Sequence, residues 1–77
     1  MIKTLHVWEV RASVISNTTQ ARHEVKAKVA TENRNYSDAN SIALERVQAI
    51  ILEKYKHCSF EYISHLYHLC EVSYRVD

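Results

Sequence analysis

Histidine and cysteine side chains, which can bind metal ions, crowd one stretch of this 77-residue sequence. If the stretch is a helix, Glu61, His65 and His68 have i, i+4 and i+7 spacing and share a face as a feasible ligand set. If it is a strand, His65 and His68 point to opposite faces and the set separates. The spacing matches no zinc finger and no H-E-x-x-H motif. The fourteen residues of the stretch include His57, Cys58, His65, His68 and Cys70.

The chain contains no glycine and no proline. Without glycine there is no phosphate-binding loop, no G-x-G-x-x-G turn and no nucleophile elbow. His57 precedes Cys58, but neighbouring residues on a strand do not usually hydrogen-bond to each other, and a nucleophile also needs an oxyanion pocket. We therefore expect no enzyme activity, no cofactor, no small-molecule substrate and no metal. The residues that remain as metal candidates are His6, His23, His65 and His68.

Cellular location follows from what the sequence lacks. No run approaches the roughly 18 apolar residues of a membrane span, and charged Lys3 and Glu9 interrupt the start of the chain too early for a signal peptide. We expect a cytoplasmic protein without membrane contact. In that compartment Cys58 and Cys70 are expected to be reduced, buried thiols.

The first half of the sequence predicts a β-hairpin. Residues Ile2 to Ser16 are rich in β-branched and aromatic types, and Gln20 to Thr31 alternate between apolar and polar. Even positions of the first strand, including Trp8, and odd positions of the second face the core. A loop with an even number of residues, such as Asn17-Thr18, brings these faces together, with Asn17 in the left-handed turn conformation.

A helix and a third strand are expected to follow. Ser37 or Asp38 caps a helix from Asp38 to about Lys56, whose apolar residues have helical spacing. Residues 59–77 carry both a helical arc and a strand-like composition, and we favour a strand with a bulge near Ser64. The prediction is one α+β domain over residues 1–77. It has β-β-α-β order, a three-stranded antiparallel sheet in the order 2-1-3, and one helix on one face.

Two surfaces of this fold are left uncovered. The strands outrun the helix, so the hairpin tip or the end of the third strand must overhang, exposing apolar residues that favour a homodimer. The expected dimer edge is Val72, Tyr74 and Val76, and a hairpin-tip overhang exposes Val14 and Ile15. The uncovered sheet face is either simply solvated or a binding site for a protein partner, including one within a nucleoprotein complex. Its residues are Lys3, Leu5, Val7, Arg11, Arg22, Lys26 and Lys28, beside Glu9 and Glu24.

One short motif resembles a known family. Leu5-His6-Val7-Trp8, followed by His23 in the second strand and then a helix, resembles the cytoplasmic domain of cation diffusion facilitator transporters. This resemblance implies a metal-responsive regulatory domain in which His6, His23 and His65 are the ligands.

The layout of the chain is similar to a second group of proteins. A strand pair containing Val25-Lys26-Ala27-Lys28-Val29-Ala30, a polar stretch, an alanine-containing helix and a closing strand resemble small phage-encoded inhibitors of host defence, such as anti-CRISPR proteins and phage antitoxins. This resemblance implies an inhibitor of a host defence complex. We therefore expect a non-enzymatic protein that acts by protein–protein contact, with the metal-responsive domain as the alternative.

Overall fold

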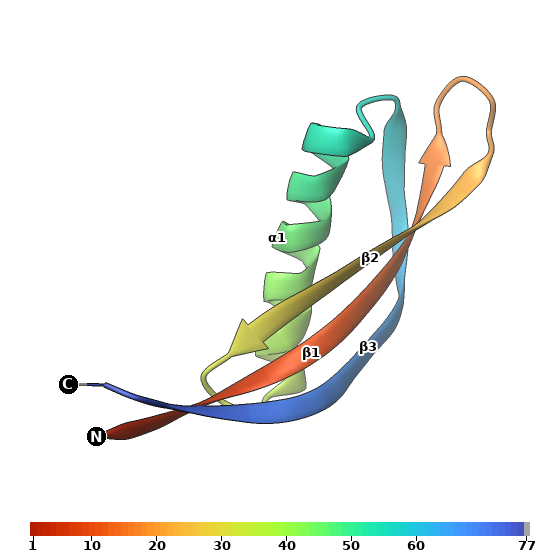
Figure 1. Cartoon of the computed structure of the whole chain (residues 1–77). Helices are drawn as coiled ribbons and strands as arrows, with labels where there is room; N and C mark the ends of the chain where they lie inside the picture. Colours follow the sequence, from red (N-terminus) through yellow and green to blue (C-terminus); the bar gives the residue numbers. More distant parts are fainter. Residues whose placement is uncertain (77) are drawn as a thin grey trace.

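The computed structural model describes residues 1–76 and has the predicted architecture (Figure 1). Its elements are strand β1 (Ile2–Ser16), strand β2 (Arg22–Thr31), helix α1 (Tyr36–Lys54) and strand β3 (Cys58–Arg75). The sheet is antiparallel in the order β2-β1-β3, and α1 lies on one of its faces. The β-β-α-β prediction and its strand order are confirmed, and the last segment is a strand rather than a helix. Asp77 lies outside the described residues.

The hairpin turn differs from the prediction in length and in the residue that bends it. The Ser16 N–H donates to the Ala21 carbonyl at 2.8 Å, so residues 17–20 form a four-residue loop. The number is even, as matching core faces require, but Gln20 (φ 62°) takes the left-handed conformation in place of Asn17. Asn17 has other partners: its N–H donates to the His57 carbonyl, and its Oδ1 accepts from Ser59 at 2.7 Å.

Helix α1 begins and ends two residues earlier than predicted. The Asn35 side chain accepts from the N–H groups of Ser37 (2.9 Å) and Asp38 (3.4 Å), so Asn35 is the N-cap in place of Ser37 or Asp38. One stripe of the helix is buried, and its two alanines let the helix lie close to the sheet. The buried residues are Ala39, Ala43, Val47 and Ile51.

The core lies between this stripe and the helix side of the sheet. Trp8, Val10, Ala12 and Val14 occupy the predicted even positions of β1, and Val10 is fully buried. Val25 and Val29 of β2 complete the buried cluster, as their odd positions predict. Partly buried residues of β3 flank it: Phe60, Ile63 and Leu66.

Strand β3 follows β1 with three shifts of register. Against β1, the residues left unpaired are Glu61, Ser64 and Leu69, so the bulge at Ser64 is confirmed and two more were missed. Each bulge exchanges the faces of the residues that follow, because side chains alternate along a strand. As a result, the even positions of β3 do not share one face. Phe60 and Leu66 face the helix, whereas Tyr62, Cys70, Val72 and Tyr74 face away from it.

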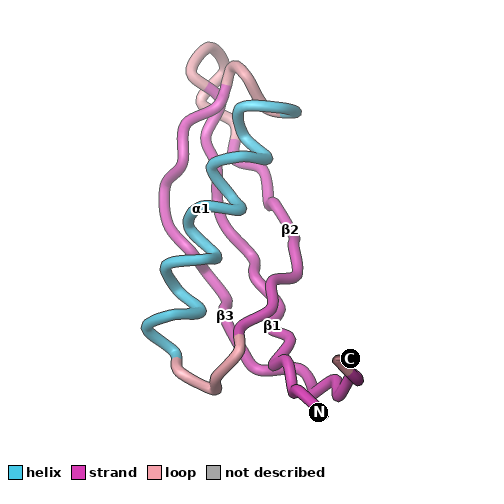
Figure 2. The backbone as a smooth tube through the Cα atoms, turned by 90° about the vertical axis from the view of Figure 1, so that its left-hand side faces the viewer, coloured by secondary structure: helices cyan, strands magenta, loops and turns pink. Residues whose placement is uncertain are grey.

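The two terminal strand segments extend beyond the rest of the molecule. β2 ends at Thr31 opposite His6, so residues 2–5 of β1 pair only with residues 72–75 of β3. This two-stranded part, called the ribbon below, projects past α1 in both views (Figures 1 and 2). The molecule measures 51 × 21 × 15 Å as a result. The predicted overhang is thus at the end of β3, not at the hairpin tip, where Val14 is fully buried and Ile15 half-buried.

Within residues 1–76, no helix combines the length and the apolar character that crossing a membrane would require.

The cysteines are both free. Cys58 packs against the core, but Cys70 is exposed on the face away from the helix, so the expectation of two buried thiols is wrong for Cys70.

Candidate functional site

The sheet face opposite α1, called the open face, carries every partner-binding residue that the sequence suggested. The register places odd residues of β1 opposite even residues of β2 there, for example Arg11 opposite Lys26 and Glu9 opposite Lys28. Leu5 and Val7 lie on the same face opposite Val72 and Cys70 of β3. The set on this face is Lys3, Leu5, Val7, Arg11, Arg22, Lys26 and Lys28.

Acidic side chains neutralise much of the expected basic character of this face. Glu9 pairs with Arg11 (3.8 Å), and Glu24 pairs with Lys26 (3.7 Å). A third acid, Glu61, was not anticipated, because only the bulge at that position turns it toward the open face. Glu61 binds the Arg22 Nε at 3.1 Å and accepts from the Ser13 hydroxyl at 2.8 Å.

Sequence reasoning did not predict that three tyrosines of β3 share the open face. Tyr62, Tyr67 and Tyr74 lie opposite Ser13, Glu9 and Lys3 of β1 and are 55%, 39% and 39% exposed. Only Tyr74 was predicted to be exposed, as part of the dimer edge, and the bulges of β3 place all three tyrosines on the open face. Three tyrosines in one strand were a signal for a surface role, because Tyr is enriched where proteins meet partners.

The ribbon has apolar side chains but no covering element. Met1 is 84% and Ile2 74% exposed, and the predicted edge residues Val72, Tyr74 and Val76 are 47%, 39% and 36% exposed. A shallow depression of about 520 Å³ lies between the strand ends, lined by Met1, Ile2, Ser73, Tyr74 and Arg75. Two main-chain bonds with Val76 close this end: the Val76 N–H donates to the Met1 carbonyl at 2.9 Å, and the terminal ammonium group donates to the Val76 carbonyl.

The histidines suggested as metal ligands do not all meet. His23 pairs with Val14 at the hairpin end, eight residues along β1 from His6, or about 26 Å. His65 lies on the open face opposite Arg11, whereas His68 lies on the helix side opposite Trp8. Neither the helical set of Glu61, His65 and His68 nor the set implied by the transporter resemblance is assembled.

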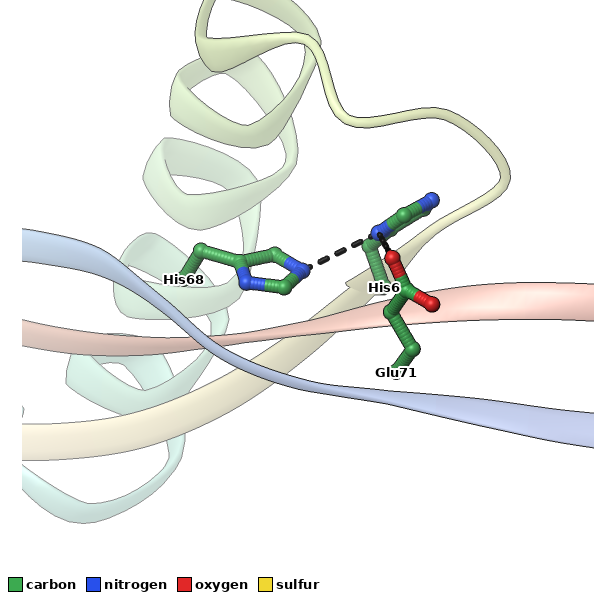
Figure 3. A group of neighbouring side chains, drawn as sticks. All are labelled: His6, His68 and Glu71. Carbon is green, nitrogen blue, oxygen red and sulfur yellow. Dashed lines mark hydrogen bonds and ion pairs between the residues drawn. The ribbon is translucent and has the colours of Figure 1, made fainter.

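A different set of potential metal ligands does lie close together, at the point where the ribbon joins the body of the sheet (Figure 3). His6 Nδ1 lies 3.0 Å from His68 Nε2 and 3.7 Å from Glu71 Oε1. His6 and Glu71 are cross-strand partners, and the bulge at Leu69 places His68 on the same face as Glu71. In a regular strand, side chains three residues apart lie on opposite faces. Strict alternation therefore predicts that His68 and Glu71 lie on opposite faces of the sheet.

The environment of His68 favours its neutral form. Partial burial of the ring lowers the pKa of His68, Arg34 and His6 lower it further, and Glu71 opposes them. The ring packs edge-on against the Trp8 indole, with ring centres 5.3 Å apart. Trp8 is itself fixed, because its Nε1–H donates to the Thr31 hydroxyl at 2.9 Å.

Comparison with family models, curated proteins and solved structures gives no match for this chain.

Proposed function

We propose that this chain is a non-enzymatic binding protein that acts through protein–protein contacts, and that its first contact is with a second copy through the ribbon. The ribbon is the observation that carries the proposal, because it is two-stranded and its apolar side chains are uncovered. Two strands alone are marginally stable in water, and a third strand or a packed layer stabilises them. A ribbon of this kind therefore favours association.

A second copy suits the ribbon because β3 is an edge strand along its whole length. Antiparallel pairing of β3 with its copy about a two-fold axis would join two three-stranded sheets into one. Val72, Tyr74 and Val76 would lie at that junction. The charges of β2, among them Lys26 and Lys28, discourage the same pairing at the opposite edge of the sheet.

The open face is the surface that such a dimer would offer to another protein. Tyrosines and aliphatic side chains lie there beside ion pairs, a mixture typical of protein interfaces. An inhibitor of a host defence complex, the class implied by the resemblance in layout, would act in this way by occupying a surface of its target.

Protein is favoured over nucleic acid because the basic residues are largely paired. Exposed tyrosines can stack on bases, but binding to single strands also needs a groove of positive charge along the backbone. On the open face, five cations stand against Glu9, Glu24 and Glu61, and three of the five have acidic partners. The remaining excess is small for phosphate binding.

Light scattering coupled to size exclusion tests the dimer. We expect the mass of two chains at high concentration and of one chain for Val72→Asp, because a charged side chain on an edge strand opposes edge-to-edge pairing. The control is Leu52→Asp, which changes a side chain that is 76% exposed on α1 and should leave the mass unchanged. A single-chain mass for the wild type at every concentration would refute the dimer.

Fluorescence anisotropy with a labelled single-stranded RNA tests the class of partner. We expect no binding at 150 mM salt, because acidic side chains pair with three of the five cations of the open face. Binding that weakens steeply with salt, and that Tyr67→Ser abolishes, would contradict a protein-binding face and assign it to nucleic acid.

A further inference from the structure

We propose that His6, His68 and Glu71 form a binding site for a divalent transition metal ion, with Zn²⁺ as the probe. These side chains are called the histidine cluster below. This inference does not depend on the dimer or on the open face, since the cluster lies on the helix side of the sheet where the ribbon begins.

The donor atoms are already close together. One nitrogen of each imidazole and one carboxylate oxygen lie within 4.8 Å of one another. The two nitrogens are 3.0 Å apart. Two imidazole nitrogens on one tetrahedral zinc ion, each bonded at about 2.0–2.1 Å, are separated by about 3.3–3.4 Å. A small opening of the pair therefore lets an ion take the place of the proton that now joins the two rings.

The chemistry of the three donors fits the same class of ion. Two imidazoles and one carboxylate suit zinc and its neighbours in the first transition row rather than Mg²⁺ or Ca²⁺, which prefer oxygen ligands. Three protein ligands leave a fourth position for water. The Glu71 side chain is 57% exposed and the His6 side chain 13%, so an ion can enter from the carboxylate side.

The surrounding contacts hold the cluster in place. His68 packs on Trp8, and Trp8 bonds to Thr31, whose hydroxyl donates to the Asn33 carbonyl at 2.6 Å. The bulge at Leu69 fixes His68 and Glu71 on one face. Ligands held in this way by their neighbours lose little freedom on binding. Figure 3 shows the two rings and the carboxylate directed at one another.

Thermal unfolding with added ZnCl₂ tests the site, using untagged protein stripped with a chelator. For the wild type, zinc at about 100 times its Kd should raise the unfolding midpoint by on the order of 10 °C, because binding to the native state stabilises it. Titration calorimetry should give one ion per chain. No rise at millimolar zinc would overturn the proposal.

Variants separate this site from zinc bound elsewhere. His68→Gln should lose the rise, and Glu71→Gln, whose side chain is largely exposed and which should fold normally, should weaken zinc binding at least about tenfold. The matched control is His65→Gln on the same strand, which should bind as the wild type does. Equal binding by Glu71→Gln and the wild type, or loss of binding in His65→Gln, would contradict the assignment.

Discussion

The body of the sheet and the ribbon are built from the same two strands but differ in what covers them. In the body, β1 lies between β2 and β3 beneath α1, and Val10 is fully buried. In the ribbon, eight residues earlier on the same face of β1, Ile2 is 74% exposed. Ile2 and Val10 both occupy even positions of β1, so their difference in burial depends on the neighbouring layer. The core side chains of the body are covered by α1, whereas the ribbon has exposed apolar side chains.

The largest effect is expected from Trp8→Ala in the body. The Trp8 side chain is 5% exposed, and its removal leaves a cavity and takes the indole N–H from Thr31. Loss of a buried aromatic side chain costs about 3–5 kcal/mol, enough to unfold much of a domain this small. Urea unfolding followed by far-UV circular dichroism measures the change. A loss below about 1 kcal/mol would mean that Trp8 does not support the body.

A matched pair of valines compares the two regions directly. Val10→Ala should lower the free energy of unfolding by about 2–3 kcal/mol, because it opens a cavity in a fully buried site. Val72→Ala in the ribbon should cost less than about 1 kcal/mol in dilute monomer, because that side chain is 47% exposed. Urea unfolding at low protein concentration gives both values. Equal losses would remove the distinction between body and ribbon.

At the boundary between the regions, His68 should make stability depend on pH. Its pKa is lowered in the folded state, so the unfolded chain binds more protons as the pH falls below about 6.5. Stability should therefore fall from about pH 6.5 down to the folded pKa and then level off, by less than the cost of Val10→Ala. Urea unfolding of metal-free protein at pH 7.5 and 5.5 measures this loss. It should shrink in His68→Gln, and an undiminished loss there would assign the effect to other groups.

The smallest effect is expected at the hairpin turn, at the end of the body far from the ribbon. Gln20 has φ 62°, a conformation that costs a residue with a side chain about 1 kcal/mol and costs glycine little. Gln20→Gly should therefore stabilise the protein by about 0.5 kcal/mol, after the entropy of the more flexible unfolded chain is subtracted. Thermal unfolding at low concentration detects the change. A loss of stability would mean that the Gln20 side chain contributes more than its backbone costs.

Local patterns predicted most of the body of the fold. The alternation of β1 and β2 predicted Trp8 and Val25 in the core, and helical spacing predicted the buried stripe of α1 that includes Val47. The capping residue was missed because Asn35, Ser37 and Asp38 are all good caps, and their order does not reveal which side chain will turn inward.

The candidate sites were harder to predict because they depend on bulges. The bulges at Glu61, Ser64 and Leu69 arise from pairing with β1, a long-range property with little local signature. One of them brings His68 beside Glu71, and together they place Tyr62 and Tyr74 on the open face. The residues of the open face on β1 and β2 were predictable, because no bulge interrupts their pairing.

Hydrogen exchange of backbone amides at two protein concentrations tests the central claim, that the ribbon needs a partner and the body does not. In dilute monomer, amides of the ribbon and of Val76 should exchange far faster than those around Val10, because a two-stranded segment opens locally. At concentrations where two chains associate, exchange in residues 72–76 should slow at least about tenfold, while exchange around Val10 stays unchanged. Ribbon exchange that is slow in dilute solution, or independent of concentration, would contradict the account.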